Sequence, residues 1–600
     1  MTTVVQTSIH RVLFIPELLD LVFSYLDHSA NANNACVCKQ WSEIALDTLW
    51  KSVDDIGRLF ALLAPVIKRE GRVYKFTRTP EASDWKRFTL YARRVRCLSL
   101  QDRMGDQRPS TTMFDIVART RTTFHILPNL HHLTWITTDR EMRNAAVIFM
   151  HEKVTHFLVS VSTDEPHHLS AFFQDVASRM PNLTHLDLQV CNPGDSRHPF
   201  YPVGSVKGVE AEVGALLRDL PKLEKVIFPN YWITSKIMEQ LSSLEVLEVI
   251  QFEFFDQQGW GLKEDVQDFN PHLEDGSFPT LWDLSVTCSL SDITRFITAP
   301  FAPAHLTCLY VASVDFEIPT SINQFITSAK ESSPCLTKLY INTIPQQLWH
   351  LRLPALTERV TLETLEPLFS FTELTTFEIS HVYPLAFSQE DVEAFATRWK
   401  APLDTLTLNN EPLYPEKSLL TLRALLPFAA HCPSLKTLGL YMDATAADLP
   451  STIPRPFENL SLLSVGVSSI QEVGPITIFL SRLCPLACGI EYGATWGDDF
   501  PFRWRGEAIV EEVEGAEADP DEGLDWPEGS EGRECVGAQL GERAEKWREV
   551  EQTLPLLIKS GMEDRLRTKV MQEEIEDLRM RTGVLMDMEK VNRGGSCIIA

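Results

Sequence analysis

The chain has 600 residues, of which 44% are hydrophobic and 23% charged, and its formal net charge is -27. This length exceeds what one compact core usually holds, so several domains or an extensible repeat are expected, and the composition is that of a globular protein. The acidic balance and the lack of a basic patch exclude a nucleic-acid scaffold. With neither a twenty-residue apolar run nor a signal peptide, the chain is expected in the cytoplasm or nucleus, with a disordered N-terminus at residues 1–10 and reduced cysteines.

Residues 11–51 predict a small helical bundle. Apolar residues recur at steps of three and four from Ile15 to Leu26, and Pro16 stands where a first helical turn tolerates proline. Leu21 and Tyr25 lie off that stripe, so the helix is apolar on two sides and one neighbour cannot cover it. A second stripe follows a polar loop and runs through Cys38, Trp41, Ala45 and Leu49.

Four ordered motifs give this segment a family resemblance. They read Ile15-Pro16-Glu17-Leu18-Leu19, Val22-Phe23-Ser24-Tyr25-Leu26, Val37-Cys38-Lys39-Gln40-Trp41 and Leu49-Trp50-Lys51. On these motifs residues 11–51 resemble an F-box, which implies docking on a Skp-type adaptor and, through it, on a cullin. The resemblance places the adaptor contacts on nine residues: Ile15, Pro16, Leu19, Val22, Phe23, Leu26, Val37, Cys38 and Trp41.

Residues 52–92 predict a helical connector, and residues 93–502 then repeat one phrase. Leucine, two residues, an apolar residue, one residue and another apolar residue return thirteen times, with helical segments between them. The phrases begin at Val95, Leu130, Val154, Leu183, Leu223, Leu244, Leu281, Leu306, Leu336, Leu374, Leu403, Leu435 and Leu460. A strand plus a helix per unit resembles the leucine-rich repeat. The expected fold is therefore α/β, an F-box followed by an irregular leucine-rich-repeat solenoid; an ordinary α/β sheet is the alternative.

The residue between the last two apolar positions of each phrase should point away from the core. At that register Tyr310 and Tyr340 fall in successive phrases, with Glu248 and Glu378 to either side and Lys338 close by. Exposed tyrosines among charges are typical of a protein-binding hot spot. A cross-strand pair that only stiffens the sheet is the other interpretation.

Beyond residue 502 the composition changes. Residues 503–541 are acidic and are expected to form a disordered linker. Residues 542–592 predict two helices separated at Pro555, which either cap the repeat array or wait for a partner; capping is favoured because an open array end exposes its core. Residues 593–600 form a flexible tail whose last four residues match a Cys-aliphatic-aliphatic-X box, so prenylation of Cys597 and membrane attachment through it are one alternative. An unmodified tail is the other, favoured by the lack of a polybasic run.

The motifs of catalysis are absent from the sequence, so no enzyme activity, catalytic residue, cofactor or metal site is expected. His131 and His132 are adjacent on an expected strand and should point to opposite faces, so shared metal ligation is not expected. Cys36-x-Cys38 lies in the F-box-like segment, where small apolar side chains are needed, and Cys484-x-x-x-Cys488 has no second pair nearby. An F-box joined to a repeat array resembles the substrate receptors of Skp-cullin-F-box ubiquitin ligases. This resemblance implies a repeat array that binds an unknown target protein. A repeat scaffold without any ligase role remains the alternative.

Overall fold

The computed structural model describes residues 13, 15–68, 73–101, 108–164, 166–191, 204–252, 258–345, 355, 358–399, 401–415, 417–445, 449–450, 453–494 and 533–594. The chain separates into two compact units, residues 1–312 and residues 313–600. Residues 1–10, most of the expected acidic linker and the tail around Cys597 lie outside the described residues. Among the helices described, none has the length and apolar character needed to cross a bilayer.

Unit 1 (residues 1–312) is built on a parallel sheet in which each strand pairs with the next along the sheet. Its strands, in spatial order, are β1 (Ser52–Val53), β4 (Cys97–Gln101), β6 (His132–Ile136), β7 (His156–Val161), β8 (His185–Val190), β9 (Lys225–Phe228), β10 (Val249–Phe252), β11 (Asp283–Thr287) and β12 (Cys308–Ala312). Sequential parallel neighbours require a crossover after each strand, and helices supply most of them. These helices are α7 (Thr111–Thr120), α8 (Arg140–Ala145), α9 (Pro166–Arg179), α10 (Glu210–Asp219), α11 (Ser235–Ser242) and α12 (Leu290–Thr298).

The segment expected to be a helical connector, residues 52–92, is only partly helical. It contains α5 (Ile56–Phe60) and α6 (Ala82–Ala92), but also β1 and the strands β2 (Val66–Lys68) and β3 (Val73–Phe76). β2 and β3 form a small sheet with β5 (Arg108–Pro109). α5 ends at Phe60, and the apolar residues that follow it lie in a turn and in the strand β2, so the segment is not helical throughout.

Unit 2 (residues 313–600) repeats the same design. Its parallel strands are β13 (Lys338–Asn342), β14 (Thr376–Ser380), β15 (Thr405–Leu408), β16 (Thr437–Leu440), β18 (Leu462–Gly466) and β20 (Gly489–Tyr492). The helices of this unit are α13 (Pro319–Ser332), α14 (Gln389–Arg398), α15 (Leu425–His431), α16 (Val473–Leu483) and α18 (Arg533–Gly594). β17 (Asp443–Ala444) and β19 (Ser469–Ile470) pair separately.

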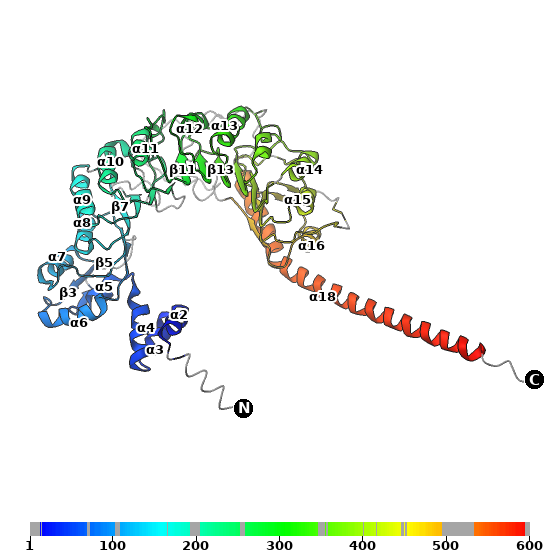
Figure 1. Cartoon of the computed structure of the whole chain (residues 1–600), viewed down its shortest axis with the longest axis horizontal. Helices are drawn as coiled ribbons and strands as arrows, with labels where there is room; N and C mark the ends of the chain where they lie inside the picture. Colours follow the sequence, from blue (N-terminus) through cyan, green and yellow to red (C-terminus); the bar gives the residue numbers. More distant parts are fainter. Residues whose placement is uncertain are drawn as a thin grey trace, which may run out of the picture. The chain divides into compact units, whose positions relative to one another are not determined.

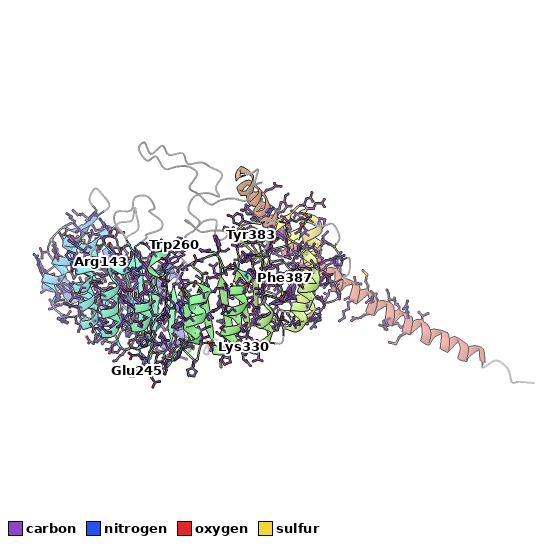
Figure 2. The ribbon with its side chains drawn as sticks, turned by 90° about the horizontal axis from the view of Figure 1, so that it is seen from above. Arg143, Glu245, Trp260, Lys330, Tyr383 and Phe387 are labelled. Carbon is purple, nitrogen blue, oxygen red and sulfur yellow. The ribbon has the colours of Figure 1, made fainter. Side chains whose placement is uncertain are left out.

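The repeated phrase is the strand signal in both units. Its apolar positions, such as Leu133, Trp135, Leu186 and Leu188, are buried, and the residues between them face the opposite, open side of the sheet. The side chains that follow a strand lie at one edge of this layer and those that precede a strand at the other. Figure 2 shows this in unit 1, where Arg143 and Trp260 lie on the edge opposite Glu245.

One phrase was predicted in the wrong register. Leu244, Leu247 and Val249 fit the pattern, but so do Leu247, Ile250 and Phe252, three residues later. Pairing with β9 selects the second, because Ile250 aligns with Val226 and Phe252 with Phe228. The open-face residue of β10 is therefore Gln251, and Glu248 precedes the strand. β20 was not predicted, because Ala487 stands where the other phrases begin with leucine or valine.

The C-terminal helix α18 is continuous, which corrects the break expected at Pro555 (Figure 1). Proline removes one helical hydrogen bond and costs about 3 kcal/mol. Burial on the adjacent turns offsets that cost: Trp547, Val550, Leu554 and Ile558 are buried, and α18 packs on α16 and β20.

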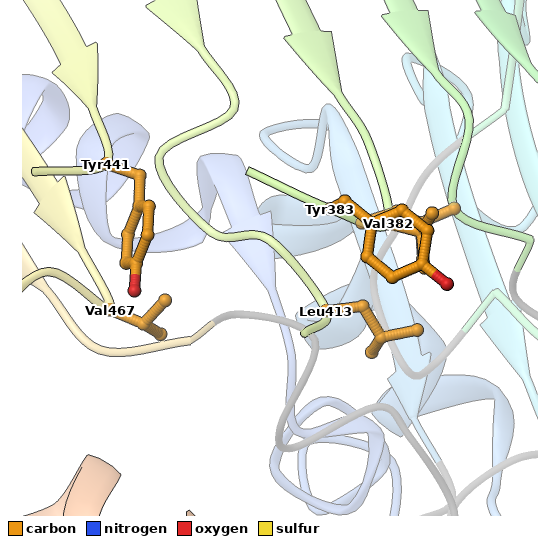
Figure 3. Close-up of a cluster of buried hydrophobic side chains, with 6 residues drawn as sticks. Val382, Tyr383, Leu413, Tyr441 and Val467 are labelled. Carbon is orange, nitrogen blue, oxygen red and sulfur yellow. The ribbon is translucent and has the colours of Figure 1, made fainter. Parts of the chain in front are cut away.

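The first part of α18 also covers the loops that follow the strands of unit 2. The indole Nε1 of Trp547 donates to the carbonyl of Ser468 at 3.0 Å, and Arg543 donates to the carbonyl of Val467 at 2.9 Å. Val467 belongs to a buried cluster of these loops, drawn in Figure 3 with Val382, Tyr383, Leu413 and Tyr441. Leu540 of α18 packs on this cluster, an arrangement that fits a cap.

Candidate functional site

Three short helices form the N-terminal bundle: α2 (Pro16–Ser24), α3 (His28–Asn34) and α4 (Lys39–Lys51). α2 starts at Pro16, whose fixed φ suits a first helical position. Asp27 caps α3 by accepting from the N–H of Ala30 at 2.7 Å. α4 packs against both other helices.

The bundle has a very small core. Leu19, Phe23 and Ala45 are buried, and the ring of Trp41 meets that of Phe23 edge-on at 5.4 Å. The buried Asn31 amide holds the end of α2, because its Nδ2 donates to the carbonyls of Phe23 at 2.9 Å and Leu26 at 3.2 Å. These contacts explain how so few residues keep a defined shape.

Most of the large apolar side chains of the bundle lie outside this core. Val22 is 52% exposed and Tyr25 83%, values that burial inside the bundle would not leave. The exposed set is Ile15, Leu18, Leu21, Val22, Tyr25, Leu26 and Val37. A concentration of exposed apolar side chains on one small bundle is typical of a protein-docking surface. These seven residues are called the docking surface below.

The structure divides the nine predicted adaptor contacts. Ile15, Pro16, Val22, Leu26, Val37 and Cys38 are exposed, and Trp41 is partly buried. Leu19 and Phe23 are each only 2% exposed. These two fill the core of the bundle, which leaves them little surface for direct contact with a partner. The nine predicted contacts do not include the exposed residues Leu18, Leu21 and Tyr25. The second apolar side of the helix was the sequence signal that could have added them to the prediction.

A buried arginine fixes the bundle to the sheet of unit 1. The guanidinium of Arg94 forms ion pairs with Glu43 and Asp47 of α4 and donates to the carbonyl of Glu43 at 3.0 Å. The hydrogen bond from Arg94 lowers the pKa of the Glu43 carboxyl. β1 directly follows α4 and pairs with β4, Ser52 lying opposite Cys97. The docking surface is thereby held in a fixed orientation relative to the first strands.

The second candidate surface is the open face of the sheet. Tyr340 aligns with Glu378 on β14 as expected, and both are half-buried. Burial and the nearby Glu491 raise the pKa of the Glu378 carboxyl. In unit 1, Tyr310 packs edge-on against Phe252 at 5.3 Å. Tyr310 and Tyr340 belong to different units, so their expected proximity remains a prediction.

The remaining members of the predicted target patch separate. Lys338 is exposed at the start of β13, beside Thr376 of β14. Glu248 does not belong to the patch, because it precedes β10 and does not occupy an open-face position of that strand. The indole Nε1 of Trp282 donates to its carboxylate at 3.5 Å. The open face of unit 2 therefore keeps Lys338, Tyr340 and Glu378 from the original prediction.

One cluster among the described residues suggests other chemistry. His125, His151 and Glu152 lie close enough to share an ion. However, both ring nitrogens of the buried His151 are engaged, Nε2 with the carbonyl of Leu127 at 2.9 Å and Nδ1 with the N–H of Lys153 at 3.2 Å. The ten cysteines from Cys36 to Cys488 are free thiols.

Comparison with protein families identifies the N-terminal bundle. Residues 16–55 match the F-box-like family, a match that covers less than a tenth of the chain. The chain thus carries an F-box-like domain, and such domains typically bind Skp-type adaptors. The search of curated proteins gives no match.

Proposed function

We propose that this chain is the substrate-recognition subunit of a Skp-cullin-F-box ubiquitin ligase in the cytoplasm or nucleus. The docking surface carries this proposal, because its apolar side chains are exposed on an F-box-like bundle whose core is already filled by other residues. We propose that a Skp-type adaptor covers this surface and connects the chain to a cullin. An F-box-like domain fits such a role in these ligases generally.

We further propose that the strand-and-helix array is a leucine-rich-repeat solenoid that holds the target protein. Support comes from the recurrence of one phrase on successive parallel strands in each unit, with buried leucines at the same register. On the open face of unit 2, Lys338, Tyr340 and Glu378 combine an aromatic ring with both charges, as target-binding residues would.

In this proposal the chain performs no bond chemistry. Its mechanism is effective concentration: a target tethered to the array meets the ubiquitin-carrying enzyme in a near-intramolecular encounter. The fixed junction made by Arg94 and β1 contributes, because a tether without free rotation restricts the positions that the target can sample.

Coexpression of the full-length chain with a Skp-type adaptor and a cullin tests the proposal. We expect the three to elute together from size-exclusion chromatography and to transfer ubiquitin when the remaining ligase components are added. A folded chain that elutes without the adaptor contradicts the proposal.

The alternative, a repeat scaffold without ligase function, has one observation in its favour. α4 leads straight into β1, the first strand of the sheet, which is the position that a cap would take. A cap, however, has no use for an exposed apolar surface. Adaptor binding by the intact chain therefore separates the two functions.

A further inference from the structure

Strand pairing assembles a basic edge on unit 1, along the side of the sheet where β1, β4, β6, β7, β8 and β9 begin. Each strand contributes its first residue and the three residues before it. The cations in these windows are Lys51, Arg94, Arg96, Lys153, Lys222 and Lys225, whereas the only carboxylate in them is that of Glu224. Arg94 is buried and paired with α4. The other five cations are called the basic edge below. The sequence contains no basic run here, because the cations come from separate strands.

Backbone hydrogen bonds place the windows side by side. The N–H of Arg96 donates to the carbonyl of Lys51 at 2.8 Å, and that of Glu224 donates to the carbonyl of Thr184 at 2.8 Å. The first residues of the strands also align, from Ser52 opposite Cys97 to His185 opposite Lys225. The ladder of the sheet thus continues ahead of the strands and brings the cations to one side of it.

Neutral oxygens hold three of the five cations. The guanidinium of Arg96 donates to the carbonyl of Arg93 at 2.7 Å. Nζ of Lys222 donates to Oδ1 of Asn182 at 2.7 Å, and Nζ of Lys153 donates to the carbonyl of Pro128 at 3.1 Å. These hydrogen bonds fix the ends of long side chains without cancelling their charge. Lys51, Lys153 and Lys222 are exposed, so their charge is available to a partner.

The first positions between Cys97 and Lys225 are all histidines. His132, His156 and His185 align on β6, β7 and β8, and neighbouring rings stack with their centroids 4.0 Å apart. Burial lowers the pKa of all three imidazoles, so the stacked rings are neutral at pH 7. A polar strip without negative charge therefore joins the cations of the basic edge.

The sign of the charge reverses beyond β9. The corresponding windows of β10 and β11 contain neither lysine nor arginine, and their charged residues are Glu248 and Asp283. Glu245 lies on the same side of the sheet, opposite Arg143 and Trp260 in Figure 2. The basic edge therefore ends at β10.

We propose that the basic edge binds an acidic segment of the target protein. This proposal rests on the function proposed above, in which the array holds a target. Opposite charge on two partners steers their encounter and excludes wrong partners. A local positive surface matters in this chain, because its net charge of -27 otherwise repels an acidic partner. The six strands span about 24 Å at about 4.8 Å per spacing, a distance that about seven extended residues cover.

Fluorescence anisotropy with the full-length chain and a labelled glutamate-rich peptide of about ten residues tests the proposal, since that length crosses the six strands. The same peptide with glutamine in place of glutamate is the neutral comparison. We expect the chain to prefer the acidic peptide and to bind it more weakly as NaCl rises from about 50 to about 200 mM, because salt screens exposed charges.

The double variant K153E/K222E should weaken binding of the acidic peptide about tenfold, because each reversal removes an attraction and adds a repulsion of similar size. K86E/K207E reverses two exposed lysines of unit 1 outside the basic edge and should bind as the parent does. Circular dichroism establishes that both variants are folded. K153Q/K222Q, which removes the charges without reversing them, should give a smaller loss.

The proposal is overturned if folded K153E/K222E binds the acidic peptide as tightly as the parent, or if K86E/K207E loses as much affinity. Equal affinity of the parent for the neutral peptide also overturns it. Tighter binding of a single-stranded oligonucleotide than of the acidic peptide would assign the surface to nucleic acid instead. Adaptor binding is measured on the same samples. A parent chain that binds the adaptor but not the acidic peptide refutes this proposal alone, whereas a parent that does not bind the adaptor refutes the ligase role.

Discussion

The substitution V22D gives the sharpest test of the docking surface. Val22 is 52% exposed, whereas its neighbours Leu19 and Phe23 are buried, so the change should leave the bundle folded. The exposed part of the side chain is roughly 80 Å², whose burial by a partner contributes about 2 kcal/mol at 25 cal/mol per Å². Losing that contribution weakens binding about 30-fold. Desolvation of the new carboxylate adds to the loss, so about 30-fold is the minimum expected.

Binding of the full-length chain to an immobilised Skp-type adaptor measures this effect directly. I478D is the matched control: Ile478 of α16 is 47% exposed in unit 2, so the same kind of change should leave adaptor affinity unaltered. Unaltered adaptor affinity in folded V22D would refute the assignment of this surface. An equal loss in I478D would show that the added charge acts non-specifically.

Three further predictions concern the array. W547A should lower the free energy of unfolding of unit 2 by about 3–5 kcal/mol, because it leaves a cavity and removes the hydrogen bond to the carbonyl of Ser468. Urea titration measures this change, and L566A, at an exposed position of the same helix, should have little effect. Burial lowers the pKa of His381 to about 4, so as the pH falls the unfolded state binds the proton of this histidine before the folded state does. The free energy of unfolding should therefore fall by about 3 kcal/mol between pH 6.5 and pH 4. The same pH dependence of stability in H381N would contradict this. Replacing Tyr310 and Tyr340 by alanine should reduce capture of the target from cell extracts, and undiminished capture by the folded double variant would leave them only a structural role.

Some of the fold could be predicted because it depends on residues close together in the chain. The spacing of Leu183, Leu186 and Leu188 predicts a strand that buries alternate residues, and β8 forms there. Prediction from local spacing fails where the same residues fit more than one strand register. The segment from Leu244 to Phe252 fits two registers, and pairing with β9 selects the second. Pro555 is a local helix breaker, but burial of residues on both sides keeps α18 continuous.

The sequence by itself determined that an N-terminal helix has two apolar sides and that strands of one pattern recur behind it, because both follow from the periodicity of side chains along a local backbone. Only the tertiary structure decided which apolar side of the helix is buried inside the bundle. α4 covers Leu19 and Phe23 and leaves Val22 and Leu26 exposed. Contact among His132, His156 and His185 was likewise decided by strand pairing, because it depends on the lateral order of β6, β7 and β8. That order is a property of packing between distant segments, which spacing along one segment does not encode.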